Sequence, residues 1–324
     1  MMNQRRADGS LRHLITLESL GRTEVETLLD RSQHYVRPLG AMPPSNRTLA
    51  GRTIGNLFTE PSTRTRVSFE VAGRRLGAEV INLEVQLSSR AKGESMLDTI
   101  HTLEALHFDV FVIRDSEPGV VAHVANHVAP HVSVLSAGEA HLSHPTQGLL
   151  DALTVRQCKG DRFERLCVAI VGDIRHSRVA RSAYEVFTAL GVGELRLIAP
   201  RGLMPEPGEF PAGRRFSTPE AGLPDADVVM MLRIQKERMA QADIPDGDEY
   251  FARYGLTVPR LRLARSDAIV MHPQPMNRGI EIASEVADGA QSVIRQQVRN
   301  GVAVRMAVLA EVARPRPLAR PAGT

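Results

Sequence analysis

Short apolar segments alternate with segments of helical character along this chain, and the alternation restricts the folds that it can adopt. A first series of apolar runs covers residues 51–58, 78–83, 108–113 and 132–135, and a second covers 166–171, 195–198, 227–232 and 268–271. Nearly continuous apolar runs indicate strands that are buried on both faces, as in parallel sheets covered by helices. The pattern therefore predicts an α/β protein with two series of strands.

The bulk composition agrees with such a fold. A chain of 324 residues is long enough for two domains, and its 43% hydrophobic content supports well-filled cores. Cys158 and Cys167 offer neither a disulfide framework nor a metal-ligand spacing, which favours a reducing cytoplasm. No apolar run approaches the roughly 20 residues that cross a bilayer, and the N-terminus lacks the apolar core of a signal peptide.

The charge balance points to small anions rather than to nucleic acid. The net charge is +3 and the pI is near 9.1, but only 4% of the residues are aromatic. The sequence has no zinc or helix-turn-helix pattern that would support a nucleic-acid interface. Its arginines lie within local motifs, which suggests that they bind anionic small molecules.

Residues 58–70 have the composition of an anion-binding helix N-terminus. Ser62 and Thr63 suit the entry of a helix, where backbone N–H groups lack partners and the dipole favours a negative guest. Arg64 and Arg66 add planar guanidinium groups that match phosphate oxygens. The residues alone fit either a phosphate site or an ordinary capped helix with solvated arginines.

Two further stretches of the first half carry candidate residues. Residues 86–94 are polar and by composition form a solvent-exposed loop. Arg114 ends the strand 108–113, at the strand end where ligands meet open α/β sheets, although it could simply pair with Asp115 or Glu117.

The segment around residue 144 places a histidine next to a helix start. Pro145 at the first helical position holds His144 in the preceding loop, and Gln147 follows within the first turn. His141 is expected to be a hydrogen-bonded structural residue.

The second half contains two more candidates and excludes one class of cofactor. The turn after the strand 166–171 lacks G-x-G-x-x-G, which argues against a dinucleotide site. Arg178 lies at the entry of the next helix. Arg233 follows the strand 227–232 and begins a charged cluster, which by itself fits a solvated surface.

After the last strand, two prolines flank Gln274. Pro273 and Pro275 cannot donate backbone N–H groups to a sheet, and they leave the intervening carbonyls free to accept from an NH₂ group. A final helix-like stretch runs from about 292 to 313.

Five segments of the chain resemble, in this order, the signatures of the aspartate and ornithine carbamoyltransferases. They are Ser62-Thr63-Arg64-Thr65-Arg66, the polar loop, His144-Pro145-Thr146-Gln147, Arg233-x-Gln235 and His272-Pro273-Gln274-Pro275. The resemblance implies two doubly wound domains, each a parallel sheet flanked by helices, linked by interdomain helices. It implies a carbamoyl-phosphate-binding domain of residues 1–157 plus 292–324, to which the C-terminal helix returns, and an aspartate-binding domain of residues 158–291.

The resemblance also assigns roles to individual residues. It implies carbamoyl-phosphate binding by Ser62, Thr63, Arg64, Thr65, Arg114, His144, Gln147 and the backbone of Pro273 and Gln274, with Ser88 and Lys92 from a neighbouring subunit. It implies catalytic roles for Arg64, Thr65, Arg114, His144 and Lys92, and aspartate binding by Lys92, Arg178, Arg233 and Gln235. Many members have Leu, Ala or Gly where this chain has Gln274; a backbone contact tolerates that change, but the longer side chain could narrow the pocket.

Arg233-x-Gln235 is typical of the aspartate members. The implied reaction transfers the carbamoyl group of carbamoyl phosphate to L-aspartate and gives N-carbamoyl-L-aspartate and phosphate, the committed step of de novo pyrimidine (UMP) synthesis. The resemblance implies a cytoplasmic homotrimer with shared active sites and with no metal, cofactor, nucleic acid or membrane. It leaves open a larger assembly with regulatory chains or a dihydroorotase-like protein.

Three alternatives are weighed against this hypothesis. They are a transferase for ornithine or an acylated ornithine, a non-catalytic assembly or regulatory subunit, and a dinucleotide-dependent oxidoreductase. Ornithine members carry a Ser-Met-Gly turn and a His-Cys-Leu-Pro motif, which this sequence lacks. The intact set of polar motif residues opposes the second alternative, and the missing glycine fingerprint opposes the third.

Overall fold

The computed structural model describes residues 4–38, 40–83, 95–234 and 246–313. The chain divides into two compact units, one of residues 1–15, 31–140 and 302–324 and the other of residues 16–30 and 141–301. Helices α1 (Arg22–Tyr35) and α11 (Ile294–Val312) contribute residues to both units. None of the described helices has the length and apolar character that crossing a membrane requires.

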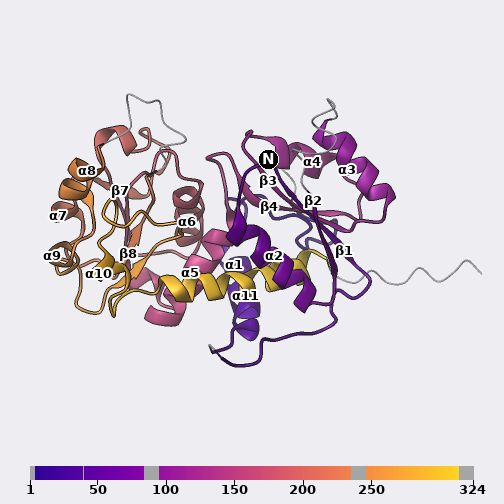
Figure 1. The fold of residues 1–324 in the computed structure, drawn as a ribbon, viewed down its shortest axis with the longest axis horizontal. Helices are drawn as coiled ribbons and strands as arrows, with labels where there is room; N and C mark the ends of the chain where they lie inside the picture. The colour runs from indigo at the N-terminus through magenta and orange to yellow at the C-terminus, as the bar shows by residue number, and fades with distance from the viewer. Residues whose placement is uncertain (1–3, 39, 84–94, 235–245, 314–324) are drawn as a thin grey trace, which may run out of the picture. The chain divides into compact units, whose positions relative to one another are not determined.

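The first unit contains a parallel sheet of four strands in the order β2-β1-β3-β4 (Figure 1). Its elements are β1 (Thr53–Phe58), α2 (Thr63–Arg75), β2 (Glu79–Leu83), α3 (Met96–Ala105), β3 (Val110–Asp115), α4 (Val120–His127) and β4 (Ser133–Glu139). The chain moves from β1 to β2 in one direction and returns past β1 to β3. Because such crossovers are right-handed, α2 covers one face of the sheet and α3 and α4 cover the other.

Apolar side chains fill both sides of this sheet. Phe111 and Ile113 of β3 pack against Ile100 of α3 and Val124 of α4 in one buried cluster. The helix predicted after the phosphate motif is confirmed as α2. Its buried side is formed by residues such as Phe69, whereas Val67, one of the apolar positions from which the helix was predicted, is 46% exposed.

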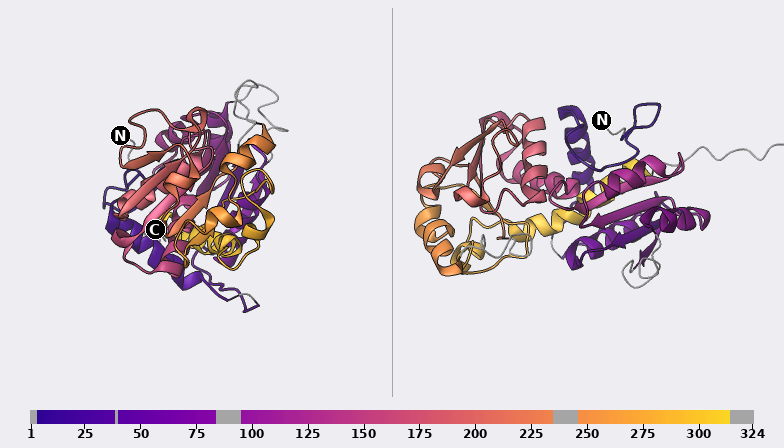
Figure 2. Two further views of the ribbon diagram at one scale, coloured as in Figure 1. Left: turned by 90° about the vertical axis from the view of Figure 1, so that its left-hand side faces the viewer. Right: turned by 90° about the horizontal axis from the view of Figure 1, so that it is seen from above.

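The second unit contains a parallel sheet of five strands in the order β7-β6-β5-β8-β9. Its strands are β5 (Cys167–Val171), β6 (Glu194–Ile198), β7 (Gly213–Phe216), β8 (Val228–Met231) and β9 (Ile269–Met271). Its helices are α5 (Pro145–Lys159), η2 (Phe163–Arg165), α6 (Arg178–Ala189), η3 (Arg201–Leu203), α7 (Pro219–Gly222), α8 (Gly247–Tyr254), α9 (Val258–Leu261) and α10 (Ser284–Ala287). Figure 2 shows helices on both faces of each sheet.

A close approach between α5 and α6 fixes the start of α5. A Cβ atom at Gly148 would lie 2.5 Å from the carbonyl oxygen of Ser182, so a glycine is needed at this contact. The Ser182 hydroxyl also accepts a hydrogen bond of 2.8 Å from the backbone N–H of His144. The helix that carries the His-Pro-Thr-Gln segment is therefore held firmly against its neighbour.

The predicted fold class is confirmed, since both series of strands form parallel sheets flanked by helices. The compact units place residues 141–157 with the second sheet, whereas the expected division into binding domains placed them with the first. That functional division, 1–157 plus 292–324 and 158–291, stays a prediction.

Glu185 on α6 is a buried carboxyl group that should make stability depend on pH. Its Oε2 accepts from the backbone N–H of Leu17 at 3.0 Å and from the Thr16 hydroxyl at 3.2 Å, but burial raises its pKa to about 7. The folded protein then keeps a proton that the unfolded chain has lost, so stability falls as the pH rises from about 4.5 to about 7.

We expect Glu185→Gln to remove this penalty, because glutamine stays neutral and can still accept from Leu17. The melting temperature of the variant should exceed that of the wild type at pH 8, by an amount corresponding to roughly 2 kcal/mol, and should match it near pH 5. Calorimetric melts at the two pH values test this, with the exposed Glu285→Gln as a control. An equal difference at both pH values would contradict the titration.

Candidate active site

Both sheets have a point at which the strand order reverses. In the first unit it lies between β1 and β3, and in the second it lies between β5 and β8. Open parallel sheets bind ligands beyond the carboxyl ends of the strands at such a point, because the loops there diverge to opposite faces. Candidate residues follow the strands on both sides of each switch point.

In the first unit, the predicted phosphate motif forms the first turn of α2. Ser62 is the N-cap residue and does not cap the helix with its own side chain, and Thr63 begins the helix. Thr63 and Arg64 are exposed, whereas Thr65 is buried. The backbone N–H groups of a helix start, hydroxyl groups and one exposed guanidinium thus meet just beyond β1, as an anion requires.

Arg114 of β3 lies on the other side of this switch point. It pairs with Phe58 of β1, and the register between β3 and β4 shifts next to it, between Ile113 and Asp115. Such an irregularity changes the direction in which a side chain points. The Arg114 guanidinium forms an ion pair of 3.1 Å with Glu60 and donates to the carbonyl of Ala137 at 3.4 Å.

The Glu60 contact was not expected from the sequence, which suggested Asp115 or Glu117 as partners of Arg114. Glu60 lies in the loop that follows β1. The pair joins the ends of the two strands that flank the switch point. The Glu60 carboxylate also neutralises the charge of the Arg114 guanidinium, which is only 13% exposed.

In the second unit, His144 is the N-cap residue of α5 and is 4% exposed. Pro145 occupies the first helical position as predicted. Gln147 is also buried, and its Nε2 donates to Asp151 Oδ1 at 2.9 Å within the same helix. His144 and Gln147 therefore occupy the first turn of a helix whose N-terminal end is held in place by α6.

Two arginines flank the second switch point. Arg178 follows β5 and begins α6, and it is almost completely buried. The preceding residue, Ser177, caps this helix, because its hydroxyl accepts from the backbone N–H of Ala180. Arg233 follows β8, the strand that pairs directly with β5, and is half-buried. Two guanidinium groups beside adjacent strand ends favour an anionic ligand with more than one carboxylate.

The loop after β9 reaches the same edge of the second sheet. The imidazole of His272 accepts from the backbone N–H of Gln274 at 2.9 Å through Nδ1. Pro273 and Gln274 are half-buried, so their carbonyl groups lie near the surface of this edge. Gln274 adopts a positive φ of 59°, which the bond to His272 helps to hold.

Acidic and phenolic groups near this edge are held by neighbours or kept neutral. Asp173 accepts from the backbone N–H and from Nδ1 of His176 at 3.2 and 2.9 Å. Burial raises the pKa of Tyr250, and the nearby carboxylates of Glu281 and Asp173 raise it further. Among the described residues, no group of three or more His, Cys, Asp and Glu is arranged to hold a metal ion.

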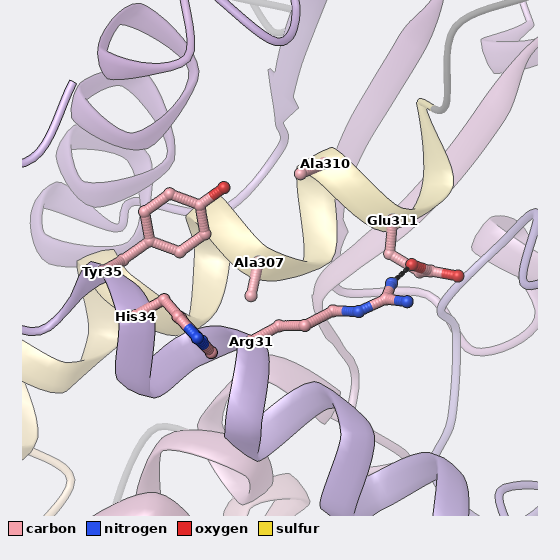
Figure 3. A pocket seen from close by; sticks show the side chains of 6 residues that line it. All are labelled: Arg31, His34, Tyr35, Ala307, Ala310 and Glu311. Carbon is pink, nitrogen blue, oxygen red and sulfur yellow. Dashed lines mark ion pairs between the residues drawn. The ribbon is translucent and has the colours of Figure 1, made fainter. Parts of the chain in front are cut away.

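A hollow elsewhere in the first unit contains none of the predicted site residues. It has a volume of about 280 Å³ and lies between the ends of α1 and α11, lined by Arg31, His34, Tyr35, Ala307, Ala310 and Glu311 (Figure 3). Arg31 is engaged in an ion pair with Glu311, which neutralises the strongest positive charge of the hollow.

The structure groups the predicted residues by unit. Ser62, Thr63, Arg64, Thr65 and Arg114 gather at one sheet edge of the first unit, and His144, Gln147, Arg178, Arg233, Pro273 and Gln274 belong to the second. Ser88, Lys92 and Gln235 lie outside the described residues. The sequence analysis did not identify Glu60 as the partner of Arg114. Because Glu60 lies only two residues before Ser62, its closeness to the predicted phosphate motif would have made it a candidate.

Two family models match successive parts of the chain. The family model of the aspartate/ornithine carbamoyltransferase carbamoyl-P binding domain matches residues 12–157, and that of the Asp/Orn binding domain matches residues 164–312. Together the two models cover most of the chain. The chain belongs to the aspartate/ornithine carbamoyltransferase family.

Solved structures of both kinds of member resemble the chain. Aspartate transcarbamoylase from Trypanosoma cruzi, in complex with carbamoyl phosphate and aspartate, is 30% identical, with 93% of this chain and 96% of that chain covered and a TM-score of 0.82. Ornithine carbamoyltransferase from Pyrococcus furiosus is 28% identical, with 93% and 97% covered and a TM-score of 0.84. The enzyme from Thermus thermophilus, also an ornithine carbamoyltransferase, is 25% identical, with 94% and 99% covered and a TM-score of 0.82. These similarities leave the amine substrate open.

Proposed function

We propose that the protein is an aspartate carbamoyltransferase, which converts carbamoyl phosphate and L-aspartate into N-carbamoyl-L-aspartate and phosphate. One observation carries the choice of aspartate: Arg178 and Arg233 follow β5 and β8, the adjacent strands at the switch point of the second sheet. Two guanidinium groups suit the two carboxylates of aspartate, whereas the side-chain ammonium of ornithine would be repelled by them. This reaction would serve as the committed step of pyrimidine synthesis in the cytoplasm.

In this proposal, carbamoyl phosphate binds the residues of the first unit through its phosphate. The backbone N–H groups at the start of α2, with Ser62, Thr63 and Arg64, hold the phosphate oxygens. Gln147 and the carbonyl groups of Pro273 and Gln274 accept from the carbamoyl NH₂. Gln235 would assist in binding aspartate, and Ser88 and Lys92 of a neighbouring subunit would complete the phosphate site.

The chemistry is an acyl transfer that needs no covalent intermediate with the enzyme. The neutral α-amine of aspartate attacks the carbamoyl carbon, and negative charge develops on the carbonyl oxygen. Thr65, Arg114 and His144 donate to that oxygen, and each such donor is typically worth a few kcal/mol. The bond from carbon to the phosphate oxygen then breaks, and the departing phosphate takes the proton that the amine loses.

Substrate choice is tested by assaying the wild-type protein with carbamoyl phosphate and either L-aspartate or L-ornithine at equal concentrations. The proposal predicts carbamoylaspartate as the main product, detected by mass spectrometry, with little citrulline. Citrulline as the main product would identify the ornithine reaction instead. The absence of both products from fresh carbamoyl phosphate would refute both assignments.

Shared active sites in a homotrimer are tested by complementation. We expect Lys92→Ala and Arg114→Ala to be nearly inactive as separate proteins, because each lacks a cation of the site. Mixed trimers should recover a clear fraction of the wild-type activity, because some of their sites combine an intact Lys92 from one chain with an intact Arg114 from the next. Mass spectrometry should verify the mixed assembly. Verified mixed trimers without recovered activity would show that each chain supplies its own lysine.

A further inference from the structure

A continuous series of buried hydrogen bonds joins two of the candidate substrate-binding segments inside the second unit. Asp151 Oδ1 accepts from Nε2 of Gln147 and from Nε2 of Gln297, both at 2.9 Å. Gln297 Oε1 in turn accepts from the backbone N–H of His272 at 2.9 Å. The first turn of α5 is thereby linked through α11 to the loop that follows β9.

The series continues through the ring of His272. Its Nδ1 accepts from the backbone N–H of Gln274, so Nε2 carries the ring proton and donates it to Glu281 Oε1 at 3.2 Å. Glu281 also accepts from the backbone N–H of Asn277. The ring and the carboxylate therefore hold the loop 272–277 at both of its ends.

The burial of these groups makes the links strong. The side chains of His272 and Glu281 are completely buried, and Asp151 and Gln297 are 0% and 2% exposed. A buried polar group that loses its partner carries the full cost of its desolvation, so each link constrains its neighbours.

The network determines which atoms remain for a ligand. An acceptor oxygen of Asp151 faces the Gln147 amide, so the nitrogen of that amide must point toward Asp151 and its oxygen must point away. The backbone N–H of Gln274 is likewise committed to His272. Donors thus turn inward, and the Gln147 oxygen and the loop carbonyls are left as acceptors.

We propose that Asp151 and Gln297 are positioning residues that make the site select an NH₂ group over an isosteric methyl group. The proposal rests on carbamoyl phosphate being the ligand, as in the proposed function. Oriented acceptors gain hydrogen bonds from the carbamoyl NH₂, whereas the methyl group of acetyl phosphate leaves them unpaired. Loss of the network should therefore weaken carbamoyl phosphate and leave acetyl phosphate almost unaffected.

The test uses calorimetric titration of the full-length protein with fresh carbamoyl phosphate or with acetyl phosphate. Gln297→Glu places a carboxylate against Asp151 and should raise the Kd of carbamoyl phosphate roughly tenfold or more, with less than a twofold change for acetyl phosphate. Adding Asp151→Asn supplies an NH₂ donor to the new carboxylate and keeps an oxygen for Gln147. The double variant should recover most of the affinity for carbamoyl phosphate.

Gln296→Glu is the matched control, since Gln296 is the preceding residue on α11 and its Nε2 donates to Gln157 outside the network. It should bind both ligands as the wild type does. If Gln297→Glu fails to fold by near-ultraviolet circular dichroism, Gln297→Met removes the hydrogen bonds without adding charge and should show the same selective loss.

Equal weakening of both ligands, or a folded double variant that recovers nothing, would overturn the proposal. No amine is present in these titrations, so an error in the choice of aspartate would leave their outcome unchanged. Wild-type protein that binds neither ligand would refute the carbamoyl-phosphate site itself, and the proposal with it.

Discussion

Arg64→Ala should lower kcat by roughly 10³-fold while the protein remains folded. Arg64 is exposed in the first turn of α2, where its guanidinium can reach a phosphate bound at the helix N-terminus. Charge builds on that phosphate as it leaves, and removal of one such charged donor costs a few kcal/mol in the transition state. Steady-state assays with saturating substrates measure the effect, and thermal melts check the fold.

Arg74→Ala provides the matched control for this experiment. Arg74 lies in the last turn of the same helix, is exposed, and pairs with Glu70 at 3.0 Å. Its removal takes away the same charge at the opposite end of α2 and should leave turnover within about twofold of the wild type, since exposed ion pairs contribute little. Near-normal turnover in Arg64→Ala would remove the phosphate assignment.

Arg233→Ala should raise the KM of aspartate by roughly 10²-fold and leave the affinity for carbamoyl phosphate almost unchanged. The reason is the position of Arg233 after β8, beside Arg178 after β5, in the unit proposed to bind the dicarboxylate. A charged hydrogen bond to a carboxylate is worth about 1.5–3 kcal/mol. Aspartate saturation curves measure the first quantity, and calorimetric titration measures the second.

Arg253→Ala serves as the control in the second unit. Arg253 lies on α8 and forms an exposed pair with Glu249 at 3.3 Å, so its loss changes the net charge equally without touching the strand ends. We expect wild-type kinetics from it. Unchanged aspartate saturation in Arg233→Ala would refute the assignment of that residue.

Strands β3 and β8 could be predicted because they are buried on both faces and form nearly continuous apolar runs. The edge strand β7 was missed, since its sequence Gly-Arg-Arg-Phe contains a single apolar side chain. An edge strand pairs on one side only and is less buried than a central strand, so its sequence contains fewer apolar residues.

Part of the candidate site could also be predicted from local sequence patterns. Ser62 and Thr63 could be placed at a helix start because the residue preferences of helix N-termini are local, although the Ser62 side chain forms no capping hydrogen bond. The pair Arg114–Glu60 and the bonds of Asp151 to Gln297 join residues 54 and 146 positions apart. Such contacts depend on how the strands and helices pack, which local patterns do not specify.

The most direct test of the central claim is a crystal structure with N-(phosphonacetyl)-L-aspartate, which joins a phosphonate to an aspartate. A structure of the Trypanosoma cruzi aspartate transcarbamoylase contains this compound. We predict the phosphonate at the start of α2, near Arg64 and Arg114, and the two carboxylates on Arg178 and Arg233. A well-ordered ligand whose carboxylates contact neither of these last two arginines would contradict the proposed aspartate site.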